Sequence, residues 1–456
     1  MSMHKKWISL ILLVSLLLTI GARAETTLKL NGVSTKFSGD FAQRYPDVQL
    51  ETGDYTYYAT TGEMTSDMLL WSFNYDAFEL SSNCIDYHAI MEKGYCLDLS
   101  GSEIIRSAIQ NLHPVFAAQC MMDGKIYAIP HTMQINYLAF SPDALERSGM
   151  KDATTPTTFP EFLDFLERWI AYLKENPDCD VALAGMAFWG DPSFYDANSY
   201  TEVLVDELLE NYMMQQEYVG ESITFDEDVL VPLLERCYQI GHELYTCDPG
   251  VQTTYFILKV MQSTVNADYD LLSLRLNDTQ PTLISVDINL YAVYAQTQYP
   301  ELSIQLMEAL CQNNWPMYNT YLYQNTEPLL NPQYDSEITK LQQMIQDTQQ
   351  QLENEELEPS YREELEIRLE AQQATLQKNL NNENLKYLVT ANDLEWFRSY
   401  VDYMVVPMPG LFHPNDVENA NAFKQLKARF SAGQLSATDL IKELNRLAWM
   451  IEMEAM

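Results

Sequence analysis

The sequence predicts an α/β protein, because short strand-like runs alternate with longer amphipathic helices between about residues 28 and 287. A second observation is an abrupt change of composition over residues 335–384, where Gln, Glu, Asn and Leu dominate and Gly is absent. The chain has 456 residues, of which 47% are hydrophobic. It is therefore long enough for several domains, each with its own buried core.

The first 24 residues have the three parts of a secretory signal peptide. Lys5 and Lys6 supply the positive start, residues 7–20 are almost wholly apolar, and Ala22-Arg23-Ala24 forms a cleavage site of the A-x-A type. The apolar run is short for a membrane-spanning helix, although an uncleaved anchor is the alternative. We expect an exported protein, extracellular or associated with the cell surface, and periplasmic if the source is Gram-negative.

Strand and turn signals follow in the next hundred residues. Residues 28–33 and 48–50 are candidates for buried strands, and residues 75–80 alternate before the polar sequence Ser81-Ser82-Asn83. The dipeptide Asp123-Gly124 predicts a tight hairpin turn ahead of residues 126–130.

A long core helix is predicted to begin after Thr158. Thr158 is an N-cap, Pro160 suits the first turn, and Glu161 completes a capping box. The apolar residues that follow fall on one helical face, which indicates core packing and not a ligand site. They are Phe162, Phe165, Leu166, Trp169, Ile170 and Leu173.

Residues 335–384 predict an antiparallel coiled-coil hairpin inserted into the globular fold. Ile338, Leu341, Ile345, Thr348 and Leu352 follow a heptad-like step, and so do Leu365, Leu369, Gln372 and Leu376. Ser360 and Glu363 suggest a capping box at the start of the second helix. The hairpin is either a structural appendage or a surface for a partner.

The last helix is predicted to start behind Ser436, with Asp439 three residues later. Leu440, Leu444, Leu447 and Ile451 form an apolar stripe, which needs a groove on the body of the protein.

Charge and motifs exclude several functions. The net charge of −38 disfavours a nucleic-acid partner, because a polyanion requires basic patches. It is consistent with an acidic surface that keeps an exported protein in solution, or with a cationic ligand. No phosphate-binding Gly-rich motif, G-x-S-x-G or H-E-x-x-H occurs, and the six His are scattered without metal-ligand spacing. We expect no enzyme, no metal and no cofactor, although an acidic pair at glycosidase separation is not excluded by sequence.

The seven Cys do not form a disulfide framework, because they are few for the length and odd in number. Buried free thiols are favoured, with Cys84–Cys96 and Cys237–Cys247 as possible pairs. Tyr and Trp are frequent near the ends of predicted strands, as at 55–58, 71–75 and 188–195. Flat aromatic faces combined with Asp, Asn and Gln suit the recognition of sugar rings, although most of these rings are expected in the core.

Several segments carry a family resemblance. Residues 123–130 (DGKIYAIP) are the most specific, and residues 41–48 (FAQRYPDV) match a helix-to-strand step of the same family. On these motifs the chain resembles the extracellular solute-binding proteins of bacterial ABC importers, in particular the group that serves sugars and oligosaccharides. It departs from the Gram-positive members in having no Cys after the signal for lipid attachment. Further matching segments are residues 75–78, 91–95, 97–100, 299–310 and 433–436.

The resemblance implies a two-lobed periplasmic-binding-protein-like fold of type II, in which crossing strands near residues 131–136 and 285–291 join the lobes. The implied layout is a signal peptide at 1–24, the first part of lobe 1 at 25–130, the first part of lobe 2 at 131–283, a return segment of lobe 1 at 284–334, the hairpin at 335–384, and C-terminal helices packing on lobe 2 at 385–456.

The resemblance also implies a ligand site between the lobes, and open α/β sheets bind ligands at the carboxyl ends of their strands. Trp189 is expected to stack on a sugar ring, and Asn83, Gln134 and Asp191 to hydrogen-bond hydroxyl groups. His131 is either a ligand contact or a hinge residue. The full set of expected ligand-binding residues is Ser82, Asn83, His131, Gln134, Asn136, Trp189, Asp191 and Tyr195.

The implied function is that of a monomeric receptor that captures a carbohydrate by hinge closure and delivers it to the permease subunits of an ABC transporter. One alternative is a receptor for polyamines or cationic peptides, which carboxylates deep in the site would favour. Alternatives of another class are an exported glycoside hydrolase and a surface interaction protein that uses the coiled-coil hairpin.

Overall fold

The computed structural model describes residues 26–148, 150, 153–179, 181–184, 198–220, 222–247, 254–262, 269–272, 274–312, 320–354, 358–407 and 417–455. The expected signal peptide lies outside these residues. Within them, no helix is long and apolar enough to cross a membrane.

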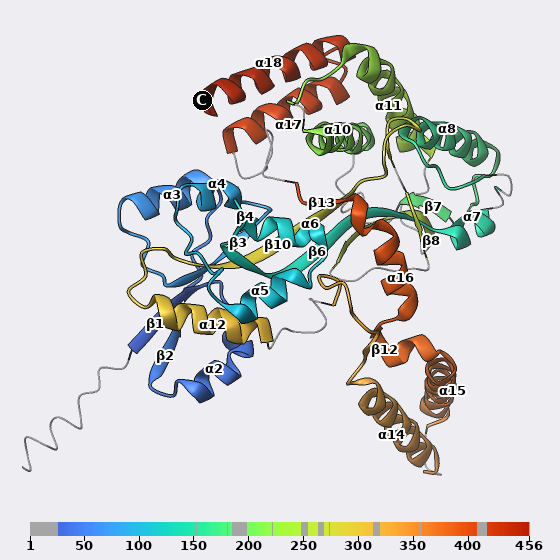
Figure 1. Ribbon diagram of the computed structural model, residues 1–456. Coiled ribbons are helices and arrows are strands. Elements are labelled where there is room, and N and C mark those ends of the chain that lie inside the picture. The colour runs from blue at the N-terminus through green and yellow to red at the C-terminus, as the bar shows by residue number, and fades with distance from the viewer. Residues whose placement is uncertain are drawn as a thin grey trace, which may run out of the picture.

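One mixed sheet runs through both halves of the described chain (Figure 1). Its strand order is β2-β1-β3-β10-β6-β8-β7, with β13 beside β10 and β9 beside β6. The outer strands pair in parallel, and the central pairs β3–β10, β10–β6 and β6–β8 are antiparallel. The bounds are β1 Thr26–Asn31, β2 Val48–Thr52, β3 Ala77–Ser81, β6 Ala128–Phe140, β7 Val181–Ala184, β8 Thr254–Gln262, β9 Asp270–Leu271, β10 Ile284–Val293 and β13 Met404–Val405.

Two long central strands, β6 and β10, carry the chain between the two halves. They pair antiparallel from Ala128 opposite Ala292 to Asn136 opposite Ser285, and so include both regions where the crossings were expected. Figure 1 shows β1, β2 and β3 at one end of this pair and β7 and β8 at the other. The two strands therefore form the connection between two lobes.

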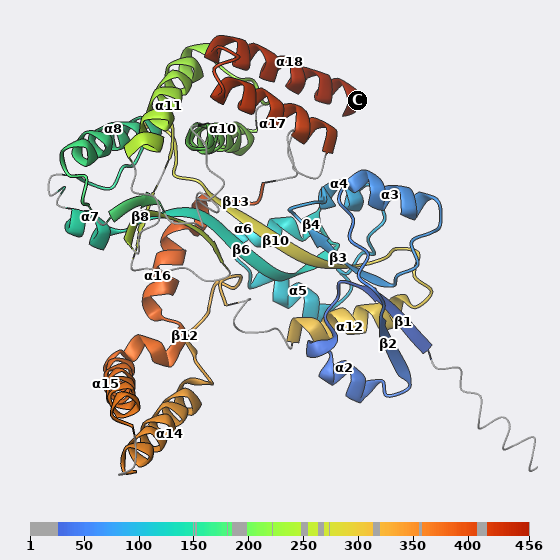
Figure 2. The same ribbon diagram turned by 180° about the vertical axis from the view of Figure 1, so that it is seen from behind.

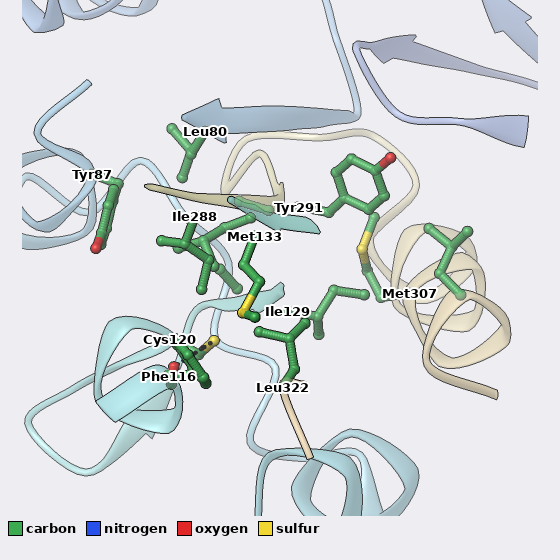
Figure 3. Packing of buried hydrophobic residues seen from close by; sticks show 14 of the residues in the cluster. Leu80, Tyr87, Phe116, Cys120, Ile129, Met133, Ile288, Tyr291, Met307 and Leu322 are labelled. Atoms are coloured by element: carbon green, nitrogen blue, oxygen red, sulfur yellow. Dashed lines mark hydrogen bonds between the residues drawn. The ribbon is translucent and has the colours of Figure 1, made fainter. Parts of the chain in front are cut away.

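Lobe 1 has a core built on β1, β3, β6 and β10. Leu80, Met133 and Ile288 come from the sheet, and Phe116 and Met307 from helices that cover it (Figure 3). Helix α12 contacts α2 and α5. The helices of this lobe are α2 Gly39–Arg44, α3 Thr61–Leu69, α4 Tyr87–Glu92, α5 Glu103–Gln110, α6 Pro114–Gln119 and α12 Pro300–Gln312, with the short helix η1 at Thr35–Phe37.

Lobe 2 has a second core, in which the predicted apolar stripe of α8 is confirmed. All six stripe residues are buried, and the Thr158 hydroxyl accepts a hydrogen bond from the Glu161 amide at 3.3 Å. Figure 2 shows α8, α10, α11, α17 and α18 gathered in this lobe. The bounds are α7 Pro142–Ser148, α8 Phe159–Glu175, α10 Ser199–Val219, α11 Glu227–Cys247, α17 Val417–Ser431 and α18 Ala437–Ala455.

The C-terminal segment divides between the lobes, which corrects the expectation that all of residues 385–456 packs on lobe 2. Leu440 and Leu444 of α18 lie in the core of lobe 2, and Ser436 caps that helix through the Asp439 amide at 3.1 Å. Leu394 and Phe397 of α16 (Ala391–Tyr400) instead join the core of lobe 1. The reason is that the Phe397 ring packs on the rings of Phe116 and Tyr321, which both belong to the core of lobe 1.

Residues 334–381 form two helices, α14 (Tyr334–Leu352) and α15 (Pro359–Asn381), that lie side by side and extend away from both lobes in Figure 1. Ile345, Thr348 and Leu365 are buried between them, and Thr348 donates to the Gln372 side chain at 3.1 Å. The expected Ser360–Glu363 capping box is wrong. Helix α15 begins at Pro359, whose missing N–H suits the first helical position.

The structure also tests the predicted turn at Asp123-Gly124 and the predicted state of the Cys residues. Met121–Met122 (β4) and Lys125–Ile126 (β5) pair around Asp123 and Gly124, both with positive φ, which confirms the hairpin turn. All seven Cys lie in the described residues and are free thiols, with Cys84, Cys96, Cys120 and Cys237 buried. The remaining elements are β11 Leu329–Leu330, β12 Tyr387–Val389, η3 Glu383–Lys386 and η4 Val401–Tyr403.

Gly241 should be essential to the packing of α10 against α11. A Cβ atom at this position would lie 2.6 Å from the backbone nitrogen of Thr201. We expect Gly241→Ala to lower the free energy of unfolding by about 1–3 kcal/mol, because the clash outweighs the higher helix propensity of Ala. Gly39→Ala is the control, since a methyl group added there would have no atom within 4 Å. Urea unfolding of both variants measures the difference, and equal stabilities would contradict the prediction.

The helix pair α14–α15 should be dispensable for the stability of the lobes. Among the described residues, helices α14 and α15 make extensive contact only with each other and with the short helix η3. The base of the pair is held together, since the Asn331 amide donates to the Lys386 carbonyl at 2.8 Å. We expect replacement of residues 334–382 by Gly-Ser-Gly to change the melting temperature by less than about 2 °C, measured by circular dichroism. A large drop would show that the pair supports the body.

Candidate functional site

The central strands present one polar face where they join the lobes. Along β10, Ser285, Asp287 and Asn289 alternate with buried Val286 and Ile288. Because directly paired residues of antiparallel strands share a face, Gln134 lies beside Asp287, and Asn136 beside Ser285. The polar side chains are half-buried, whereas the opposite face belongs to the core of lobe 1. We call Asp287, Asn289, Gln134 and Asn136 the polar row.

Asp287 is the centre of this row. Its carboxylate accepts a hydrogen bond from Asn136 Nδ2 at 2.6 Å. With its amide nitrogen turned toward Asp287, Asn83 donates to the two carboxylate oxygens at 2.5 and 3.1 Å. Gln134 Nε2 in turn donates to Asn136 Oδ1 at 3.2 Å. Three residues expected at the site from sequence are thus brought together, around a carboxylate that was not among them.

The pKa of Asp287 reflects two opposing effects. Burial raises it above the ordinary aspartate value, while the hydrogen bonds from Asn136 and Asn83 lower it by stabilising the charged form. Burial is the larger effect, so the net shift is upward. The carboxylate is therefore a hydrogen-bonded anion held in a partly dry environment.

Ser82 is tied to the neighbouring strand. Its side chain is 2% exposed, and its hydroxyl accepts a hydrogen bond from the Ile288 amide at 2.9 Å. The Ser82 amide donates to the Ile288 carbonyl at the same distance. This pair of bonds fixes the loop after β3 against β10, and so holds Asn83 next to Asp287.

His131 is the extra residue of a β-bulge in β6. Thr132 pairs with Asn289, and Pro130 with Leu290, which leaves His131 without an opposite residue. Its ring stacks on Tyr291 with centroids 4.3 Å apart. Burial lowers the pKa of His131 to about 4, so the ring is neutral at physiological pH.

Glu79 lies on the same face as the polar row, opposite Tyr291. The structure gives its carboxyl group no hydrogen bond or ion pair with any described residue, and burial raises its pKa to about 7. Gly32 has a φ of +74°, and a Cβ there would lie 2.6 Å from Glu79 Oε2 and 2.8 Å from the Tyr55 ring. Glycine is thus required for the carboxyl group and the ring to approach this backbone.

Three expected site residues, Trp189, Asp191 and Tyr195, lie outside the described residues. Asp287, Asn289 and Glu79 were missed. The signal for the first two was present in the alternating polar and apolar residues of 284–291, which predict a strand with one polar face. No local pattern distinguished Glu79, because its neighbours in space come from the loops after β1 and β2.

The site contains amide donors, amide acceptors and two carboxyl groups, which suits the hydrogen bonding of a polar ligand. No group of three metal-ligating side chains occurs among the described residues. The backbone positions of Asp287 and Glu79 are offset by roughly 13 Å along the strand direction, because Glu79 pairs with Tyr291, four residues beyond Asp287 on β10.

The sequence matches no protein-family model and no curated protein. Similar solved structures include the sugar-binding protein MalE from Xanthomonas citri, at 12% identity and a TM-score of 0.51, covering 94% of this chain and 98% of that one. Maltose-bound MalE3 from T. maritima has 13% identity and a TM-score of 0.50, with coverages of 94% and 99%. A structure from work on xylan utilization by Caldanaerobius polysaccharolyticus has 13% identity and a TM-score of 0.50, with coverages of 92% and 99%. The chain therefore has the two-lobed α/β fold of periplasmic binding proteins.

The ionisation of Glu79 should make stability depend on pH. Its pKa of about 7 in the folded state exceeds the ordinary value of 4.5, so folding loses stability as pH rises from about 4.5 through 7. We expect Glu79→Gln to be more stable than the parent by roughly 1–3 kcal/mol at pH 8 and no more stable at pH 4. Urea unfolding at both pH values tests this. Glu51→Gln, at an exposed position of β2, is the control, and a gain independent of pH would contradict the prediction.

Proposed function

We propose that this protein is the extracellular substrate-binding receptor of an ABC importer, which captures a carbohydrate between its two lobes and delivers it to permease subunits. The observation that carries the proposal is the polar row on β6 and β10, since it lies where the two cores meet. The sugar-binding names of MalE and of maltose-bound MalE3, which share the fold, support the carbohydrate assignment.

The expected ligand contacts are the amides of Asn83, Gln134 and Asn136, with the carboxylate of Asp287. Amide and carboxylate groups in pairs match the neighbouring hydroxyl groups of a sugar, because each hydroxyl both donates and accepts. Trp189, Asp191 and Tyr195 remain predicted contacts, with Trp189 stacking on a ring. Ser82 and His131 also remain predicted contacts, with a hinge role as the alternative for His131. The Ser82 hydroxyl bonds to the Ile288 amide, and His131 is the extra residue of the bulge in β6.

Capture is expected to proceed by closure of the lobes about β6 and β10. A ligand that contacts both lobes only in the closed form shifts the population toward that form, which the permease then recognises. We propose that the mature chain acts as an exported monomer. In this proposal the protein binds its sugar and releases it unchanged.

A thermal-shift screen of residues 25–456 tests the proposal. The panel contains maltose, xylobiose, cellobiose and amino disaccharides, and each recovered sugar is analysed for cleavage. A sugar at about 100 times its Kd should stabilise the protein by about 2.7 kcal/mol and be returned intact. Asn136→Ala should weaken binding by roughly 5- to 100-fold, from the loss of a hydrogen bond inside the site.

Gln110→Ala, at an exposed position of α5, is the matched control and should leave binding unchanged. Cleavage of the sugar by the parent protein would contradict the receptor function. The absence of a response to every sugar in the panel would contradict the carbohydrate assignment.

A further inference from the structure

The polar face contains two carboxyl groups, and no cation forms an ion pair with either of them among the described residues. Asp287 and Glu79 both lie partly buried on this face, on β10 and β3. Among the described residues neither carboxyl group forms an ion pair, and none of the ion pairs between those residues involves the face. Buried carboxylates in proteins are ordinarily paired or fully hydrogen-bonded, so this arrangement requires an explanation.

His131, whose ring the fold places on Tyr291, contributes no positive charge to this face. His131 stacks on Tyr291, directly opposite Glu79 in the sheet, but burial keeps its ring neutral above about pH 4. The other titratable groups that face Glu79 are the Tyr55 and Tyr291 hydroxyls, whose pKa values burial and the Glu79 charge both raise. The surroundings of the two carboxyl groups therefore contribute no positive charge from the described residues.

The hydrogen-bond donors described around Asp287 do not fill every acceptor position of its carboxylate. A carboxylate has about four positions for hydrogen bonds, and Asn136 and Asn83 supply three contacts. Asn136 presents its amide nitrogen to the carboxylate, so its oxygen does not join the carboxylate as a ligand of a metal ion. Consistently, no group of three metal-ligating residues lies in the described part of the chain. The free position suits one further N–H donor.

The carboxyl groups disfavour an anionic ligand, and the small number of metal-ligating groups among the described residues disfavours a metal ion. An organic cation is therefore favoured. The chain as a whole carries a net charge of −38, which attracts cations and repels sugar acids. A protonated amine needs a single carboxylate with hydrogen-bonding capacity, which Asp287 offers.

Resting on the proposed receptor function, we propose that the ligand carries a protonated amine, which binds against the Asp287 carboxylate on the polar row. Glu79, farther along the same face, receives a second donor group of the ligand. The predicted substrate class is therefore an amino sugar or an oligosaccharide containing one, in which the amide groups of the row bind the ring hydroxyls.

Three disaccharides with the same β-1,4-linked backbone distinguish the contribution of the amine to binding from that of the sugar rings. They are the disaccharide of glucosamine, cellobiose, and N,N′-diacetylchitobiose, which carry amines, hydroxyls and neutral amides at the same ring position. Isothermal titration calorimetry at pH 6.5 in 150 mM salt, with the full mature chain, should show the glucosamine disaccharide binding at least 10-fold more tightly than the other two. Spermidine serves as an amine without a sugar ring.

The variant Asp287→Asn keeps the shape of the side chain and removes its charge. It should weaken binding of the glucosamine disaccharide by at least 10-fold and change that of cellobiose by less than threefold. Glu79→Gln should produce a smaller loss and provides an independent variant if Asp287→Asn fails to fold. Glu51→Gln removes one exposed charge from β2 and should have no effect, which separates local recognition from the overall acidity.

Each outcome bears on the proposal separately from the receptor function. Equal or tighter binding of cellobiose or diacetylchitobiose would overturn the amine recognition and leave the carbohydrate receptor intact. Binding of spermidine alone, lost in Asp287→Asn, would support amine recognition and contradict a sugar ligand. Failure of both amine probes to bind would overturn the inference, as would amine binding that neither Asp287→Asn nor Glu79→Gln weakens.

Discussion

The hydrogen-bonded pairing of β6 with β10 is the interaction on which the rest of the structure depends. These strands join two separate cores, and their register determines which side chains face the core and which form the polar row. Side chains alternate with a period of two along a strand, so a slip of one residue would bury Asp287 and expose Ile288. The hydrophobic contacts of Ile288 and Met133 therefore determine, indirectly, where the polar groups lie (Figure 3).

The loops around this pair are arranged to support its polar face. Ser82 bonds twice to Ile288 and so places Asn83 against Asp287. Gly32 allows the Glu79 carboxyl group to approach the backbone after β1. The bulge at His131 lets its ring stack on Tyr291, where burial keeps it neutral. The result is a face rich in neutral donors and in carboxyl groups whose pKa values are raised by burial.

The remaining elements attach to this frame without altering it. Helices α17 and α18 complete the core of lobe 2, while α16 completes that of lobe 1, so the C-terminal segment contacts both halves. The α14–α15 pair enters and leaves through β11 and β12, which hydrogen-bond to each other at its base. The pair contributes no strand to the main sheet.

The sequence by itself determined the local elements, because their signals lie within a few residues. The cap at Thr158, the stripe of α8, the Asp123-Gly124 turn and the stripe of α18 all depend on neighbours along the chain. The family motifs located the crossing strands, and the amides of residues 83, 134 and 136 were anticipated. Only the tertiary structure decided that these amides surround Asp287, which is 151 residues from Asn136. It also decided that α16 packs on lobe 1. Both depend on strand register and burial, which distant segments create together and no short stretch of sequence encodes.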